Sequence, residues 1–351
     1  MTKLSYPGTG GFQLRFCRTF ERLKPFLFLS VLLMLTIVIL VPSGTVVWAF
    51  DRDDDEEDET LGGHHDRRTC SGTAQAALRA CRHDAKDNFW IAYGKCLNDS
   101  HEGNLRECLR DAQHEHREAR TLCHQQKKSR LEICTSLGEG PYDPEINPAE
   151  FLSPAAAAAT PNPYFPLVPG LVRVLQAGDE TITVTVTEET KEILGVTCTV
   201  IRDVVEEHGE TIEDTIDWYA QDIFGNVWYF GEIAKNFENG ELSNLDGSWT
   251  GGVDGAKPGI IMKANPEVGD IYRQEFALGE AEDMATVIAT TETQERAPAA
   301  DCADRCVVTH DFLPIDPGHV EKKFYAPGIG NILVIDLDTG KREELIQVIQ
   351  P

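Results

Sequence analysis

The pattern of apolar and polar residues changes character along the chain. Residues 70–136 are rich in Ala, Leu, Arg, Glu and Gln and contain no proline, a composition that favours helices. Beyond Tyr164, short segments follow in which β-branched residues alternate with polar ones, the period of strands with one buried face. The sequence therefore predicts an α+β protein in which a helical module precedes a β domain.

The helical module divides into two helices. Turn residues interrupt it over residues 97–107, where Asn104 and Glu107 have the spacing of a capping box that opens a second helix. This helix is expected to end near Ser136, because Gly138 follows it. Two helices joined by a short turn predict an antiparallel hairpin.

Residues 164–351 are predicted to form one antiparallel, strongly curved β domain, a barrel or a sandwich of about nine to twelve strands. Turn signals such as Asp338-Thr339-Gly340 separate the segments, and no long helical stretch stands out between them. The predicted strands are Thr181–Thr187, Val196–Val205, Thr211–Tyr219, Asn226–Phe230, Thr286–Thr291, Val307–Phe312, Val320–Tyr325, Asn331–Ile335 and Glu344–Ile349.

Six cysteines are spaced symmetrically along the helical module. Successive separations are 11, 15, 12, 15 and 11 residues, which read the same in both directions. At about 100° per residue, steps of 11 and 15 keep the three cysteines of each helix on one face. Alanines beside them allow the close approach of helices that a disulfide requires. A hairpin folded at residues 97–107 therefore predicts three nested disulfides, Cys70–Cys134, Cys81–Cys123 and Cys96–Cys108.

The β domain contains three further cysteines, Cys198, Cys302 and Cys306. A bond between Cys198 and Cys306, which lie in two predicted strands, is the first expectation, and a local Cys302–Cys306 bond is the alternative. A zinc knuckle in the hairpin is excluded, because the module has no Cys-x₂₋₄-Cys pair. The hairpin is either a stapled spacer or a protein-interaction arm, and the sequence does not separate the two.

The first 49 residues have the features of a secretory signal peptide. Five basic residues and one acidic residue precede an apolar run over 26–41, and Val47-Trp48-Ala49 has small residues at the positions that a signal peptidase reads. An uncleaved N-terminal anchor is the alternative. Both predict an exported protein, periplasmic or extracellular, with no transmembrane domain once the signal is cleaved.

Two segments are predicted to contain no packed core of their own. Residues 50–69 include the run DRDDDEEDE and the pair His64-His65, so they are expected to be disordered. The alternative is a weak tether for divalent cations. Residues 137–163 contain several prolines and the run Ala155–Ala159, and they are interpreted as a connector.

The net charge and the absence of known catalytic motifs argue against several classes of function. The chain has a formal charge of −26, and its N-terminal 49 residues are net basic, so the remainder is more acidic still. Nucleic acid and anionic membranes are therefore poor partners. No Walker loop, dinucleotide fingerprint, H-E-x-x-H or G-x-S-x-G occurs. We expect no enzyme activity, no catalytic residues, no cofactor and no metal site.

The candidates for a ligand or partner surface are aromatic. Trp218 and Tyr219 end one predicted strand, and Trp228 and Tyr229 begin the next. Adjacent residues of a strand face opposite sides, so one ring of each pair is expected to pack inward. Cross-strand packing of the rings in the core is the competing interpretation.

Six motifs stand out along the mature chain: PYDPEI (141–146), NPYFPLVPG (162–170), DWYAQDIFGNVWYFGE (217–232), DGAKPGIIMKANPEVGDIYRQEF (254–276), GEAEDMA (279–285) and FYAPGIG (324–330). Together they resemble a group of exported bacterial proteins with a β domain, no assigned activity and often a Cys/Ala-rich helical segment ahead of it. The resemblance implies a protein of the bacterial cell envelope or exterior, and it implies no catalytic residues. The segment LVRVLQ (171–176) departs from the group, because an aromatic-rich strand is expected there.

The sequence thus predicts a non-catalytic extracytoplasmic binding or structural protein, with an unknown protein or a small molecule as its partner. One alternative is a periplasmic carrier that holds a lipid or another amphiphile in a β half-barrel. The other is a hydrolase with an unfamiliar site.

Overall fold

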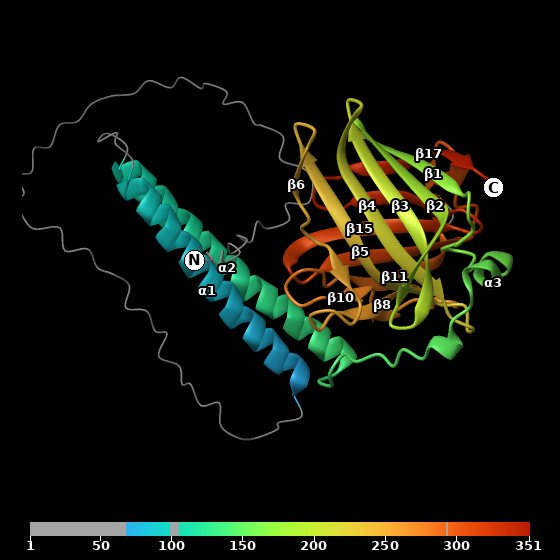
Figure 1. The fold of residues 1–351 in the computed structure, drawn as a ribbon, viewed down its shortest axis with the longest axis horizontal. Helices are drawn as coiled ribbons and strands as arrows, with labels where there is room; N and C mark the ends of the chain where they lie inside the picture. Colours follow the sequence, from blue (N-terminus) through green and yellow to red (C-terminus); the bar gives the residue numbers. More distant parts are fainter. Residues whose placement is uncertain (1–67, 99–104, 293) are drawn as a thin grey trace, which may run out of the picture. The chain divides into compact units, whose positions relative to one another are not determined.

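The computed structural model describes residues 68–98, 105–292 and 294–351 (Figure 1). The predicted signal peptide, the acidic run and Asn104 of the predicted capping box lie outside these ranges. Within the ranges, no helix combines the length and the apolar character that a membrane-spanning helix needs.

The helical module is an antiparallel hairpin. Helix α1 (Thr69–Leu97) packs along helix α2 (Leu105–Leu137). Three disulfides join them in the predicted nested order, with Cα–Cα distances of 5.6 Å for Cys70–Cys134 and 5.7 Å for both Cys81–Cys123 and Cys96–Cys108. The predicted ladder is therefore confirmed.

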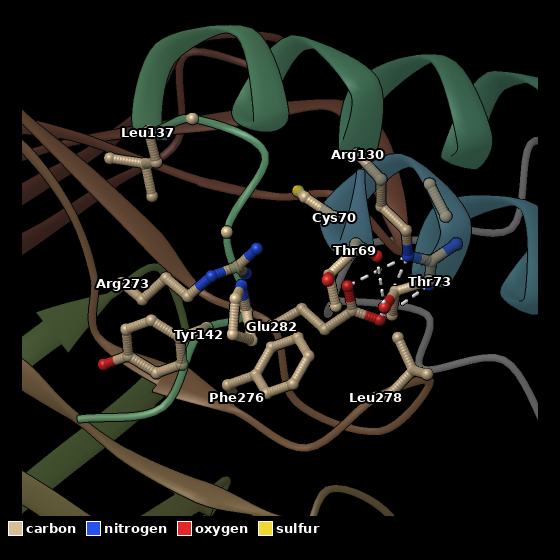
Figure 2. Close-up of a pocket in the computed structure, with 14 residues that line it drawn as sticks. Thr69, Cys70, Thr73, Arg130, Leu137, Tyr142, Arg273, Phe276, Leu278 and Glu282 are labelled. Atoms are coloured by element: carbon tan, nitrogen blue, oxygen red, sulfur yellow. Dashed lines mark hydrogen bonds and ion pairs between the residues drawn. The ribbon is translucent and has the colours of Figure 1, made fainter. Parts of the chain in front are cut away.

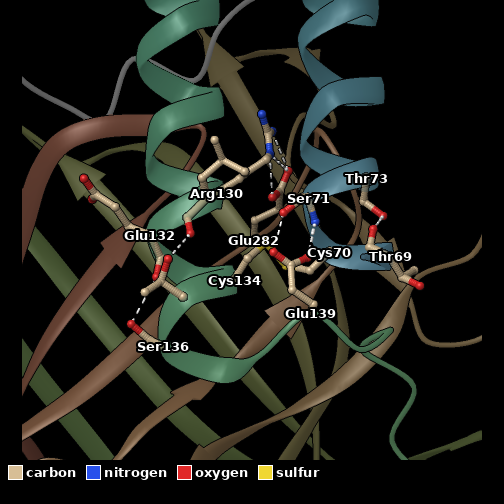
Figure 3. Close-up of a disulfide and its surroundings, with 12 residues drawn as sticks. Thr69, Cys70, Ser71, Thr73, Arg130, Glu132, Cys134, Ser136, Glu139 and Glu282 are labelled. Carbon is tan, nitrogen blue, oxygen red and sulfur yellow. Dashed lines mark hydrogen bonds and ion pairs between the residues drawn. A yellow bond between two sulfur atoms is a disulfide. The ribbon is translucent and has the colours of Figure 1, made fainter. Parts of the chain in front are cut away.

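The beginning of α1 is stabilised by a residue that follows α2. Arg68, at the N-cap position, makes no side-chain capping bond within the described residues. Instead the Glu139 carboxylate accepts hydrogen bonds from the Ser71 backbone N–H, at 3.0 Å, and from the Ser71 hydroxyl (Figure 3). A carboxylate at this position also interacts favourably with the helix dipole. The Cys70–Cys134 bond lies beside this contact and closes the same end of the hairpin.

The segment between the hairpin and the sheet is fastened to the β domain. It contains the 3₁₀ helix η1 (Pro148–Glu150) and the short helix α3 (Pro154–Ala159). The Phe151 ring packs against the rings of Trp228 and Phe230, at centroid distances of 6.0 and 5.4 Å. The buried Asn162 side chain donates to two backbone carbonyls of the β domain. The predicted connector is thus fastened to the β domain at Phe151 and Asn162.

The β domain is a fifteen-stranded antiparallel sheet with a separate pair of short strands, β12 and β13. The expected number of about nine to twelve strands is too low. Each of the nine predicted strands corresponds to an observed one, and the additional strands have two to six residues, too few to show a clear alternation. The strands are β1 (Val172–Ala177), β2 (Glu180–Ile193), β3 (Val196–Glu207), β4 (Glu210–Gln221), β5 (Val227–Glu238), β6 (Glu241–Asn244), β7 (Trp249–Thr250), β8 (Lys257–Met262), β9 (Ile271–Arg273), β10 (Glu275–Phe276), β11 (Met284–Glu292), β12 (Arg296–Ala297), β13 (Ala300–Asp301), β14 (Cys306–Leu313), β15 (Asp316–Ala326), β16 (Gly330–Asp336) and β17 (Arg342–Ile349).

The sheet curls until its two edges nearly meet. Its strand order is β10-β8-β5-β4-β3-β2-β1-β17-β16-β15-β14-β11-β9, with β6 and β7 paired to β5. The edge strands β9 and β10 are consecutive in sequence and separated by Gln274 alone. The chain therefore crosses directly from one edge to the other, and we call this crossing the seam. The predicted α+β class with a barrel-like domain is confirmed.

Gly259 on β8 allows the seam to form. A Cβ atom at this position would lie 2.4 Å from the carbonyl carbon and oxygen of Gln274 and 2.6 Å from the Arg273 carbonyl oxygen. These are main-chain atoms, which cannot rotate away as a flexible side chain could. The close approach of two backbones therefore requires a glycine here.

We expect Gly259→Ala to lower the free energy of unfolding by about 3 kcal/mol or more, the upper end of the cost of overpacking. Urea denaturation of the purified protein measures this. Gly140→Ala is the control, because a Cβ there meets nothing within 4 Å. Equal stability of the two variants would contradict the close approach at the seam.

The disulfide of the β domain joins Cys302 to Cys306, with a Cα–Cα distance of 4.8 Å, and Cys198 is a buried free thiol. The first expectation, a Cys198–Cys306 bond, is therefore wrong and the alternative is confirmed. The strands β3 and β14 that hold these residues are not neighbours in the sheet. Cys198 also packs in a different apolar cluster, with Trp218 and Phe230. Burial raises the pKa of the Cys198 thiol to about 12, so it is not a reactive nucleophile.

Candidate functional site

A pocket lies where the two helix ends joined by the Cys70–Cys134 disulfide meet the seam of the sheet. Its cavity volume is about 130 Å³. Both helices contribute to its lining, as do Tyr142 of the connecting segment, Arg273 and Phe276 of the seam, and Glu282 of the loop before β11. Figure 2 shows these side chains converging from different elements.

A buried ion pair joins α2 to the β domain at this pocket. The Arg130 Nη2 atom lies 2.6 Å from Glu282 Oε1, and Arg130 Nε lies 2.9 Å from Oε2. The two side chains are only 7% and 1% exposed. Since two of the three guanidinium nitrogens bond to the two carboxylate oxygens, the pair is bidentate, which is the strong geometry for arginine and a carboxylate.

Neighbouring contacts position the two members of this pair. The backbone N–H of Gly279 donates to Glu282 Oε1 at 2.8 Å, which fixes the carboxylate within its own loop. One turn before Arg130 on α2, the buried Gln126 amide donates to the Ile315 carbonyl oxygen at 2.7 Å. The helix is therefore fixed to the β domain at two successive turns.

A second arginine enters the pocket from the seam. The Arg273 guanidinium carbon lies 4.7 Å from the centroid of the Phe276 ring and 5.4 Å from that of Tyr142, so cation–π contacts orient it. Burial has the largest effect on the pKa of Arg273 and lowers it; nearby Glu282 raises it and nearby Arg130 lowers it. Because the ordinary pKa of arginine is so high, the group stays charged at neutral pH.

Tyr142 forms one side of the pocket as a neutral phenol. Its hydroxyl donates to the Pro258 carbonyl oxygen at 2.9 Å, which ties the connecting segment to β8. Burial raises the pKa of Tyr142 to about 12. The ring therefore contributes an apolar face and no negative charge at neutral pH.

The aromatic residues proposed as a ligand surface do not form an exposed platform. Trp218, Tyr219 and Tyr229 are buried. The rings of Tyr219 and Tyr229 stack at a centroid distance of 4.5 Å in the largest apolar cluster, while Trp218 packs in another cluster with Trp228 at its border. Trp228 is half-buried, and its indole N–H donates to Asp222 at 2.9 Å. The rings therefore serve as packing, in agreement with the competing interpretation.

Two carboxyl groups lie beside the stacked tyrosines. Asp217 and Glu232 are cross-strand partners on β4 and β5, and Asp217 accepts a hydrogen bond of 2.6 Å from the Tyr229 hydroxyl. Burial, followed by the nearby Glu232 charge, raises the pKa of Asp217 well above its ordinary value. The folded protein thus binds this proton more tightly than the unfolded chain does.

Stability should therefore decrease as the pH rises from the ordinary pKa of Asp217 towards its raised value in the folded protein. We expect Asp217→Asn to remove this loss, which makes the variant more stable than the wild type at neutral pH by about 1 kcal/mol or more. Urea denaturation at a series of pH values measures the effect, with the exposed Asp338→Asn as the control. A pH profile unchanged by Asp217→Asn would contradict the assignment.

Sequence reasoning missed every charged residue of the pocket. Arg130 looks like one of many solvated charges on a helix, and Glu282 like one of many acids. A signal was nevertheless present, because Tyr142, Arg273 and Glu282 lie in three of the motifs that stand out in the chain, over 141–146, 254–276 and 279–285. The structure brings those three motifs together at the pocket.

Within the described ranges, no group of three or more His, Cys, Asp or Glu side chains is arranged to hold a metal ion. The chemistry of the pocket is instead that of two guanidinium groups, one carboxylate and aromatic rings. Comparison of the chain with protein-family models, curated proteins and solved structures finds no significant match in any of the three.

Proposed function

We propose that this chain is a non-catalytic binding protein of the bacterial cell envelope, periplasmic or extracellular, that takes its ligand in the pocket between the hairpin and the seam. The pocket itself carries this proposal. It is a preformed concave site, lined by rings and aliphatic side chains with a few polar groups directed inward, which is the usual composition of a small-molecule site.

The disulfides support an extracytoplasmic location. Four of them occur in the described residues, and such bonds persist in oxidising compartments but are rare in the cytosol. The signal-peptide features of the first 49 residues favour the same compartment. The bacterial envelope enters the proposal through the resemblance of the motifs.

The hairpin has a defined part in this function. Residues from the first two turns of α1 and the last two turns of α2 line one side of the pocket. The Cys70–Cys134 bond fixes these two ends to each other, and the Arg130–Glu282 pair fixes them to the β domain. We therefore assign to the hairpin the role of an arm whose base forms a wall of the binding site.

The interior of the β domain does not favour an amphiphile carrier. Asp217, Glu232 and Glu275 are buried beside the stacked Tyr219 and Tyr229 rings. These carboxyl groups make this part of the interior polar, which does not suit an acyl chain. The pocket at the seam therefore supports the binding function better.

Native mass spectrometry of the full chain, purified from its own host, tests the proposal. We expect an additional small mass on the wild-type protein and its loss from Gly140→Trp. Gly140 lines the pocket and has open space around it, so a large ring can be accommodated there. Gly94→Trp, at an exposed helical position, is the control and should keep the ligand. A ligand retained by Gly140→Trp would contradict the proposal, as would a wild-type protein that neither carries a co-purified ligand nor binds an added small anion.

A further inference from the structure

Two buried nitrogen atoms of the pocket residues lack a partner. Arg130 Nη1 and Arg273 Nη1 make no hydrogen bond to any described residue, and both atoms are inaccessible to solvent. The residues as a whole are 6% and 8% exposed. Leaving a charged donor unsatisfied in a buried position is costly, so such atoms in a folded protein call for an explanation.

The charges around the cavity do not balance. Its described lining contains two guanidinium groups, Arg130 and Arg273, and a single acidic residue, Glu282. The Glu282 carboxylate already forms the bidentate pair with Arg130. Among the described lining residues, one positive charge therefore remains without a bonded counter-charge, in a protein whose formal charge is −26. A buried charge is stable only when it is paired and hydrogen-bonded.

A ligand that neutralises the remaining positive charge of the cavity is a monoanion. A dianion would place an additional negative charge close to Glu282, where like charges repel strongly in a buried site. A carboxylate carries one charge on two oxygen atoms and accepts parallel bonds from a guanidinium group. Its charge balances the remaining guanidinium group, and its two oxygen atoms can accept hydrogen bonds from two arginines.

The size of the cavity and its apolar walls define the remainder of the ligand. A volume of about 130 Å³ holds roughly four water molecules at about 30 Å³ each, which suits a carboxylate with a short tail. Phe276, Leu137 and Leu278 provide apolar surface for that tail (Figure 2). Leu278 is 44% exposed and lies at the rim.

We propose that the pocket binds a small monocarboxylate whose oxygen atoms accept hydrogen bonds from Arg130 and Arg273 and whose tail lies against Phe276 and the two leucines. This inference rests on the proposed function, since it names the ligand class of the same pocket. A phosphate-like dianion, or water alone, is the competing occupant.

Isothermal titration calorimetry with propanoate, in a buffer free of carboxylates, tests the assignment on the full chain. We expect the wild-type protein to bind propanoate at least about tenfold more tightly than inorganic phosphate. Arg273→Gln should raise the propanoate Kd at least about tenfold, because a hydrogen bond to a charged group is lost. Arg110→Gln, at a 70% exposed position of α2, should change it less than about twofold.

A second pair of variants avoids the buried residues in case Arg273→Gln folds poorly. Leu278→Asp introduces a negative charge at the rim, and Leu278→Asn has nearly the same shape without the charge. We expect the propanoate Kd of Leu278→Asp to exceed that of Leu278→Asn by about tenfold. Near-ultraviolet circular dichroism checks that both variants retain the native fold.

The results separate this inference from the function on which it rests. Equal Kd values for Leu278→Asp and Leu278→Asn, or phosphate bound as tightly as propanoate, would overturn the monocarboxylate. A wild-type protein that binds no propanoate but carries another small molecule in native mass spectrometry would also overturn it, while the binding function would stand. Absence of both propanoate and a co-purified ligand would overturn both proposals.

Discussion

Replacing Glu282 by alanine should lower the free energy of unfolding by about 3–5 kcal/mol, the cost of breaking a buried ion pair by removing one partner. The substitution leaves the Arg130 guanidinium buried without its bidentate partner and adds to the positive charge already unbalanced in the pocket. The same change detaches α2 from the loop before β11, so the hairpin should also become more accessible to protease.

Two further variants identify why Glu282→Ala should lose stability. Arg130→Met combined with Glu282→Leu removes both charges, so the double variant should recover much of the stability that Glu282→Ala loses. Glu132→Ala on the same helix removes the exposed partner of Lys128, which is 81% exposed, and should change stability by less than about 0.5 kcal/mol. Urea denaturation gives all three values. A Glu282→Ala variant as stable as Glu132→Ala would show that the ion pair does not anchor the hairpin.

Removal of the three hairpin disulfides should unfold the hairpin and leave the β domain folded. Each disulfide is worth about 2–4 kcal/mol. The residues buried in α1 and α2 are mostly small, such as Ala74, Ala77, Ala85 and Ala112, so little apolar area would remain to hold two helices together. A chain with all six hairpin cysteines replaced by serine provides the test.

Far- and near-ultraviolet circular dichroism separate the two parts of the molecule. The helical band should largely disappear in the six-serine variant, while the near-ultraviolet signal of buried rings such as Trp249 and Tyr229 in the sheet should persist. The control replaces Cys302 and Cys306, the cysteines of the β-domain disulfide, by serine and should keep the helical band. A full helical band without the hairpin disulfides would mean that packing alone maintains the helices.

The hairpin was predictable because its signals are local and repeated. The mirrored cysteine spacing allows one pairing without crossing in an antiparallel hairpin, and that pairing is observed. The long strands were predictable for a similar reason, since alternation over seven or more residues, as in Thr181–Thr187, is a strong signal. Both depend on periodicity that a single segment carries by itself.

The seam was not predictable, because it depends on which distant segments meet, and the first expectation for the β-domain disulfide failed for the same reason. Strands β9 and β10 have three and two residues, too few for a period, and exist only because the sheet edges converge there. Cys198 and Cys306 both lie in strands, but the strand order, which the sequence did not predict, separates them. The observed bond joins Cys302 and Cys306, which are only four residues apart, and this local signal was ranked second.

The contacts of the pocket were also not predictable, because they join segments that are far apart in the sequence. Arg130 and Glu282 are separated by 152 residues, and nothing in either segment alone predicts that they pair. The net charge of a strongly acidic chain also gives no sign of a cationic pocket, because it sums over all residues and the pocket contains only a few of them. The unbalanced guanidinium groups become visible only when burial and partners are known.

The stapled arm and the proposed export both require that the hairpin cysteines are oxidised in the compartment where the protein works. Peptide mapping by mass spectrometry, on protein alkylated as the host cells are opened and kept unreduced, tests this directly. We expect Cys70 linked to Cys134, Cys81 to Cys123 and Cys96 to Cys108, with Cys198 as a thiol that is alkylated only after denaturation. Six alkylated hairpin cysteines in native material would contradict both the stapled arm and the proposed export.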